Sequence, residues 1–173
     1  MKKLLLTEEP KVNVKMQKIK WGDLILSLII VYAVAFIGSI FTSSNVSSEW
    51  YNNVKPSITP PNWVFPIVWN ILFFLIAISL YLAWTNTKTQ KDKLIFAFGI
   101  NFILNILWSV FFFSLKNPLL AFFDLILLLI SILYLIILTC KINKISAYLL
   151  IPYLVWLIFA GILNVLILIG SFI

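Results

Sequence analysis

The chain has 173 residues, of which 62% are hydrophobic and only 11% charged, whereas soluble domains are about half apolar and about a quarter charged. This composition excludes an ordinary soluble enzyme and indicates a membrane protein. The lack of histidine excludes zinc or haem ligated by histidine, and the single cysteine excludes an internal disulfide framework. All thirteen basic residues are lysines and most flank apolar segments, so the net charge of +7 indicates membrane topology rather than nucleic-acid binding.

In chain order, residues 1–21 form a basic N-terminal tail and residues 22–173 a single transmembrane domain. A membrane-spanning helix needs roughly 20 mostly apolar residues. Five segments meet that requirement: 22–42, 62–84, 93–113, 118–140 and 145–172. The first is too long for a signal peptide and lacks a small-residue cleavage site, so we expect a retained anchor. The sequence therefore predicts an all-α integral membrane protein, a bundle of five transmembrane helices.

The distribution of the lysines predicts the orientation of these spans. Six lie in the tail, three in the second connection and two in the fourth, all on one side of the membrane. The opposite side holds only Lys55 and Lys116. The tendency of basic residues to stay inside predicts a cytoplasmic N-terminus, with the first connection and the C-terminus external.

The first connection contains the stretch WYNNVKPSITPPNW, with two tryptophans and three prolines. Proline restricts φ and lowers the entropy cost of holding one conformation. We expect this long loop to close a pocket, and the predicted lid residues are Trp50, Lys55, Pro56, Pro60 and Pro61. The prolines also suit ordinary helix ends. For Trp50 and Trp63, a place in the interfacial aromatic belt remains an equal alternative.

Polar and aromatic residues inside the spans predict the pocket itself. Polar groups in a membrane are costly and usually face a protein interior or a cavity. Helical spacing places several of them on one face of their span, and the alternating span directions bring most of them to the half beneath the first connection. The candidate ligand-binding residues are Trp63, Trp69, Phe73, Asn101, Asn105, Trp108, Asp124, Trp156, Ala160 and Asn164.

These residues also have structural interpretations, which the sequence leaves open. The asparagines could form hydrogen bonds between helices without touching a ligand. Asp124 could cap backbone groups or pair with an asparagine. Pro152 removes a backbone hydrogen bond inside the fifth span and predicts a kink. Asn117 followed by Pro118 predicts a capped helix start.

Several stretches resemble one known family. They are WY…KPSITPP, VWNILF, NFILNILWSVFFF, NPLLAFFD and IPYLVWLIFAGILN, which occur in that order over about residues 50–164. With them the chain resembles the tryptophan-rich sensory protein family, also called the translocator or peripheral benzodiazepine receptor family. The resemblance implies five helices and a first loop that closes a pocket for flat apolar ligands. Those ligands are porphyrins, haem, isoquinoline- or benzodiazepine-type drugs and, in animals, sterols. The resemblance also implies a possible homodimer.

The resemblance assigns roles to particular residues. It matches Asn101 and Asn105 to ligand-lining asparagines and Asp124 to the acidic residue of the fourth helix. It matches Trp69 and Trp156 to tryptophans implicated in light-dependent protoporphyrin breakdown. The forward sterol pattern after the fifth span is absent, because no basic residue follows Lys144.

The leading prediction is a membrane receptor for tetrapyrroles, protoporphyrin or haem, that regulates porphyrin level or transport. It requires no cofactor or metal, and its partners are the ligand, the lipid bilayer and a second copy, not nucleic acid. Without histidine, metal-free protoporphyrin suits the chain better than haem. One alternative is a light-dependent porphyrin-degrading enzyme that uses Trp69 and Trp156. A small-molecule transporter ranks third, because the chain has no internal repeat and Asp124 has no obvious coupling partner.

Overall fold

The computed structural model describes residues 18–170, and in them it contains helices and no strand. The long helices are α1 (Trp21–Ser43), α3 (Val64–Asn86), α4 (Lys91–Ser109), α5 (Pro118–Cys140) and α6 (Lys144–Gly170). Five segments, with α4 extended to Ser114, are long and apolar enough to cross a membrane. The predicted all-α bundle of five spans is therefore confirmed. Most of the predicted basic tail and the last residues of the predicted fifth span lie outside the described residues.

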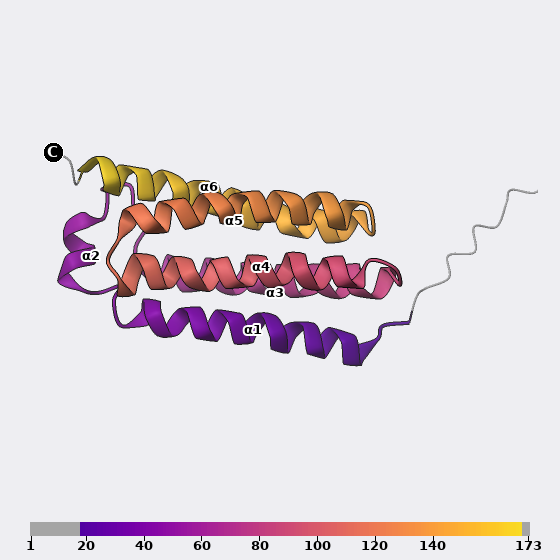
Figure 1. The fold of residues 1–173 in the computed structure, drawn as a ribbon. Coiled ribbons are helices and arrows are strands. Elements are labelled where there is room, and N and C mark those ends of the chain that lie inside the picture. Colours follow the sequence, from indigo (N-terminus) through magenta and orange to yellow (C-terminus); the bar gives the residue numbers. More distant parts are fainter. Residues whose placement is uncertain (1–17, 171–173) are drawn as a thin grey trace, which may run out of the picture.

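The five long helices lie side by side, with α2 (Glu49–Val54) across one end (Figure 1). The contacts between them close into a ring. The packed neighbours run from α1 to α3, α6, α5, α4 and back to α1. Large apolar side chains on the outer faces, such as Ile67, Ile103 and Ile137, are more than half exposed, as a lipid-facing surface requires. A ring of helices can enclose a cavity at its centre where the side chains that point inward do not fill the space.

The end of the ring that carries the α3–α4 and α5–α6 connections, here called the lysine-rich end, is closely packed. The Ser79 hydroxyl donates to the Ser146 carbonyl oxygen at 2.9 Å, and the Ser146 hydroxyl donates to the Ser79 carbonyl oxygen at 2.8 Å. Both serines are fully buried, as is Ala83 nearby on α3. These reciprocal bonds between small residues hold α3 and α6 together.

The opposite end, here called the cavity end, is shaped by two features that are not evident in the sequence. The first connection contains α2, whose N-cap Ser48 accepts a hydrogen bond from the Tyr51 amide at 3.2 Å. The last turn of α4 widens into a π-helix, η1 (Val110–Ser114). A π-helix has more residues per turn than an α-helix, and it brings both Phe112 and Phe113 inward against Tyr51.

The start of α5 follows the predicted cap. The Asn117 side chain accepts a hydrogen bond from the Leu120 amide at 3.0 Å, and Pro118 is the first helical residue. Lys116 has a left-handed φ of 49°, which turns the chain sharply between η1 and α5. Pro152 lies inside α6, which continues through it as one helix.

Candidate functional site

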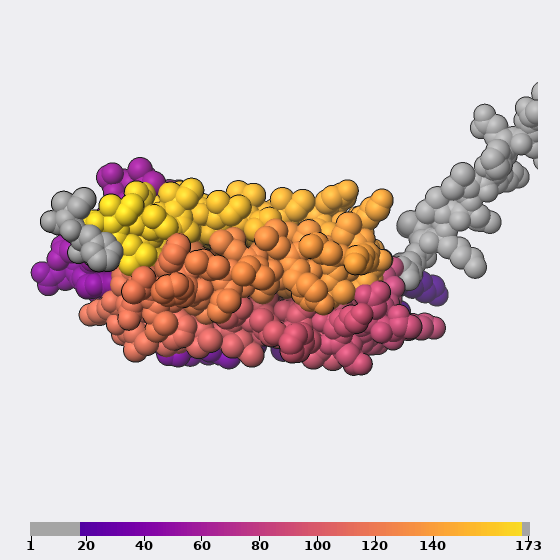
Figure 2. All heavy atoms as spheres, turned by 45° about the horizontal axis from the view of Figure 1, so that its top comes forward, coloured from indigo at the N-terminus to yellow at the C-terminus, as the bar shows by residue number. Residues whose placement is uncertain are grey.

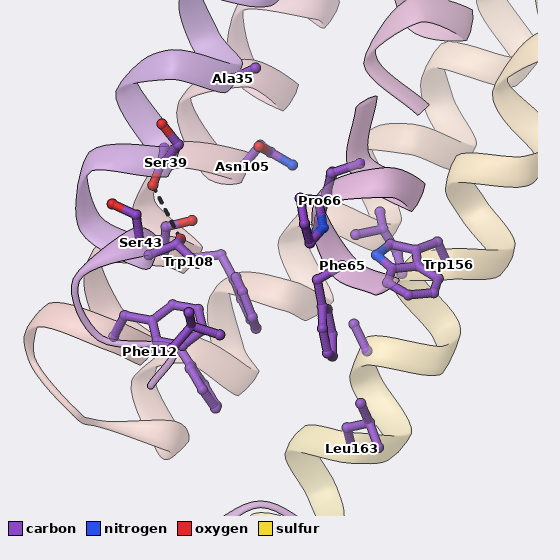
Figure 3. A pocket seen from close by; sticks show the side chains of 18 of the residues that line it. Ala35, Ser39, Ser43, Phe65, Pro66, Asn105, Trp108, Phe112, Trp156 and Leu163 are labelled. Carbon is purple, nitrogen blue, oxygen red and sulfur yellow. Dashed lines mark hydrogen bonds between the residues drawn. The ribbon is translucent and has the colours of Figure 1, made fainter. Parts of the chain in front are cut away.

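A cavity of about 680 Å³ lies inside the ring at the cavity end, which is within the size range of small-molecule sites. All five long helices and the first connection contribute to its wall. Figure 3 shows Ala35, Ser39 and Ser43 of α1 across the cavity from Phe65, Pro66 and Trp156. The predicted candidates that line it are Trp69, Phe73, Asn105, Trp108, Trp156, Ala160 and Asn164.

Tryptophan rings form two separate parts of this wall. On one side, Trp69 stacks on Phe73, with ring centroids 5.2 Å apart. On the other, Trp108 stacks on Phe112 at 5.0 Å and 12° between the ring planes. Trp156 meets the edge of Phe65 at 5.9 Å (Figure 3). Such aromatic surfaces favour stacking with a flat apolar ligand.

The two asparagines of α4 differ in position. The Asn105 amide lines the cavity and donates to the Tyr153 hydroxyl at 3.0 Å. Asn101 is buried outside the cavity wall and donates to the Ser131 hydroxyl at 2.8 Å. The structure thus gives Asn101 the interhelical role that the sequence left open, whereas Asn105 both links helices and lines the cavity.

Three further polar side chains lie in the interior between α4, α5 and α6. Asp124 is 4% exposed and does not line the cavity. Among the described residues, neither its Oδ2, nor the Trp108 Nε1, nor either amide atom of Asn164 has a hydrogen-bond partner. Leaving such a group unpaired costs about 1–3 kcal/mol, so this part of the interior is held in place by the surrounding apolar packing.

Residues 44–63 cover the cavity from the side of α2. Tyr51 is 5% exposed and packs against Phe113 at 5.6 Å. Burial raises the pKa of the Tyr51 phenol, so the side chain stays neutral at physiological pH. The Asn62 amide donates to the Val46 carbonyl at 3.2 Å and ties the two ends of the connection together. The residues of this connection that line the cavity are Val46, Tyr51, Thr59 and Asn62.

The predicted lid residues lie around this cover but not on its inner surface. Trp50 packs on Phe112 at 5.6 Å. The Lys55 Nζ lies 5.9 Å from the centroid of the Tyr51 ring, and the Pro56 carbonyl accepts a turn hydrogen bond. Pro60 lines a separate apolar groove between α3 and α6, and Pro61 is exposed just before α3.

Trp63 is also placed outside the cavity. It precedes α3 and is 66% exposed, which agrees with the interfacial alternative for this residue. The ligand-site prediction did not include α1, although Ala35, Gly38, Ser39 and Thr42 all line the cavity. Their spacing of i, i+3, i+4 and i+7 was a readable signal of one helical face made of small residues.

The comparison with family models decides the classification, because the TspO/MBR family model matches residues 27–169. The chain belongs to the TspO/MBR family. It is 42% identical over 142 residues to the tryptophan-rich protein TspO of Archaeoglobus fulgidus, a match that covers 82% of this chain and 92% of that protein. It is 32% identical to protein CrtK of Rhodobacter capsulatus, over 80% of this chain and 89% of that protein. It is 31% identical to the human translocator protein, over 75% and 78% of the two chains.

The family and the five apolar helices establish an integral, multi-pass membrane protein. The recognition of the family from sequence stretches is confirmed. The side of the membrane on which each terminus lies stays a prediction. Among residues 18–170, no group of three or more His, Cys, Asp or Glu side chains is placed to hold a metal ion.

Proposed function

We propose that this TspO/MBR family member is a membrane receptor that binds tetrapyrroles and similar flat apolar ligands in the cavity. The observation that carries the proposal is a cavity of about 680 Å³ lined by Trp69, Trp108 and Trp156 from three different helices. Rings on separate helices suit a rigid, flat molecule better than a flexible chain, because each ring can contact a different part of one plane.

Charge distribution defines how a porphyrin would lie there. Among residues 18–170 no lysine lines the cavity, so an ionised propionate inside it would lack a compensating charge from them. Lys55 lies at the same end, on α2's C-terminal side, beyond the cavity wall. In the proposed orientation the macrocycle occupies the cavity and its propionates point toward the first connection. The absence of histidine favours a metal-free porphyrin.

Equilibrium binding in the dark tests this proposal. Purified full-length protein is titrated with protoporphyrin while tryptophan fluorescence is followed, and saturable quenching at one site is expected. Trp156→Leu removes a stacking surface, so it should weaken binding by about 1 kcal/mol, or roughly fivefold. Trp84→Leu is the matched control, because Trp84 lies at the lysine-rich end beneath Lys91. Equal affinities for both variants would contradict the proposed site.

A second candidate function is light-dependent breakdown of the bound porphyrin, with dioxygen as the oxidant. It is supported by the presence of both Trp69 and Trp156 in the cavity wall, since tryptophan can donate an electron to an excited porphyrin held nearby. The double variant Trp69→Phe, Trp156→Phe keeps two rings but is harder to oxidise. Binding should fall modestly and breakdown under illumination should fall far more. Undiminished breakdown in the double variant would exclude these tryptophans as electron donors.

A further inference from the structure

The cavity wall is exposed on one side only. The exposed residues of this wall all belong to α1 or to the first turns of α3: Tyr32, Phe36, Ser39, Ser43, Pro66 and Asn70. Every lining residue from α4, η1, α5, α6 and the first connection is buried or half-buried. The α5–α6 face is a continuous packed surface (Figure 2). The side of the cavity wall that faces outward therefore lies between α1 and α3, here called the opening.

This opening lies at the depth of the lipid chains. Ser39 is about 6 Å from the end of α1, and Asn70 is about 9 Å into α3, at 1.5 Å per residue. The edge of the opening nearest the middle of the bundle is closed by the Tyr32 hydroxyl, which donates to the Asn70 carbonyl at 3.4 Å. Since the headgroup region lies outside the hydrocarbon core, most of this opening faces lipid rather than water.

Two polar side chains of the opening, those of Ser39 and Asn70, are hydrogen-bonded within their own helices. The Ser39 hydroxyl donates to the Phe36 carbonyl at 2.7 Å, and the Asn70 amide donates to the Pro66 carbonyl at 2.8 Å. The Ser39 hydroxyl and one N–H of the Asn70 amide are thus satisfied without water, which lowers the cost of placing these side chains beside lipid. Neither of these two side chains donates a bond to the other helix, so the hydrogen bond between α1 and α3 at the opening is the one from Tyr32 to Asn70.

The route from the water side is closed more firmly. Tyr51 packs against both Phe112 and Phe113, and the hydrogen bond from Asn62 to Val46 closes the connection. Entry past α2 requires separating this aromatic cluster. Entry between α1 and α3 requires only movement of side chains that are already exposed.

We propose that the gap between α1 and α3 is a lateral portal, through which flat apolar ligands dissolved in the bilayer enter the cavity. The proposal rests on the cavity being a ligand site, as proposed above. The rim of the portal consists of Phe36 and Ser39 on α1 and Pro66 and Asn70 on α3. The proposal concerns the route into the cavity and not the identity of the ligand.

A thiol placed on the far wall of the cavity tests the route without any porphyrin. Ala160→Cys is introduced into the full chain together with Cys140→Ser, which removes the native exposed thiol. The protein is reconstituted in phospholipid vesicles and reacted with lipid-soluble N-(1-pyrenyl)maleimide or with a sulfonated, membrane-impermeant maleimide. Leu163→Cys, also in the cavity wall, is a second reporter should Ala160→Cys fold poorly.

Paired bulky substitutions then close the portal or leave it open. Ser39→Trp and Asn70→Trp should slow labelling by the pyrenyl reagent about tenfold, within the range by which mutations change association rates. Their neighbours Ile40 and Ile71 are 54% and 56% exposed but do not line the cavity. Ile40→Trp and Ile71→Trp should therefore leave the rate unchanged. The impermeant reagent should label the reporter slowly in every variant.

A third variant separates the portal from the cover. Asn62→Ala removes the hydrogen bond to Val46 and should not accelerate pyrenyl labelling. The portal is overturned if Asn62→Ala accelerates labelling while Ser39→Trp does not slow it, or if the impermeant reagent reacts as fast as the lipid-soluble one. Failure of porphyrin binding would instead refute the proposed function and leave the portal result standing.

Discussion

The two ends of this bundle are built from the same five helices, yet one is solid and the other is hollow. At the lysine-rich end, small residues such as Ser79, Ala83 and Ser146 let α3 and α6 approach closely and bond to each other. At the cavity end, aromatic residues such as Trp69 and Trp108 hold the helices apart around about 680 Å³ of space. One end thus supplies the packing that the other lacks, as expected when a binding site sits on a rigid scaffold.

Among the substitutions that test this contrast between the two ends, Ser146→Leu should have the largest effect on the stability of the protein. The larger side chain has no space beside the fully buried Ser79, and it removes the hydrogen bond that the Ser146 hydroxyl donates to the Ser79 carbonyl. Overpacking and lost bonding together should destabilise the protein by about 2–4 kcal/mol, measured as a lower midpoint of thermal unfolding. Ser39→Leu is the control at the cavity end and should change the midpoint little. A similar loss in both variants would contradict the idea that the lysine-rich end carries the stability.

Filling the hollow end should reduce ligand binding without comparable loss of stability. A Cβ on Gly38 would meet only the Ser109 hydroxyl, at 3.7 Å, so Gly38→Ala is tolerated. Gly38→Leu extends into the cavity and should weaken protoporphyrin binding about tenfold or more, read by fluorescence titration. Gly99→Leu is the matched control, because a Cβ there meets nothing within 4 Å. Unchanged affinity in Gly38→Leu would show that the ligand does not occupy this part of the cavity.

Loosening the cover should have a smaller effect, seen mainly in release. The double change Pro60→Gly, Pro61→Gly makes the connection more flexible, and ordering it again on binding should cost about 0.5–2 kcal/mol. Faster release should be visible by stopped-flow displacement of protoporphyrin. Because neither proline lines the main cavity, unchanged release would mean that they serve only to start α3.

The substitutions expected to disturb the protein least test which end of the bundle faces the outside of the cell. Ser47→Cys and Thr89→Cys, each combined with Cys140→Ser, place single thiols in exposed connections at opposite ends. Surface changes of this kind alter stability by less than about 0.5 kcal/mol. In intact cells, an impermeant maleimide should label the thiol at position 47 and spare the one at position 89. The reverse pattern would invert the predicted orientation and leave the contrast between the two ends intact.

Parts of the site were predictable from spacing along single helices. Asn105 and Trp108 share a face of α4, and Trp156 and Asn164 share one of α6, so their common presence at the cavity follows from helical periodicity. Asn101 shares the face of Asn105 one turn earlier but lies beside Ser131 instead. Periodicity gives the face of a helix, but not the depth at which neighbouring helices close over it.

The sequence by itself determined the five spans, the all-helical class and the family, because each depends on local apolar length or on contiguous stretches of residues. The tertiary structure alone decided that α1 forms one wall and that η1 turns Phe112 and Phe113 toward Tyr51. It also decided that the predicted lid residues lie behind the inner surface of the cover and that the exposed lining residues gather on α1 and the first turns of α3. These features depend on which helices become neighbours and how closely they pack, and such contacts join residues that are far apart in the chain.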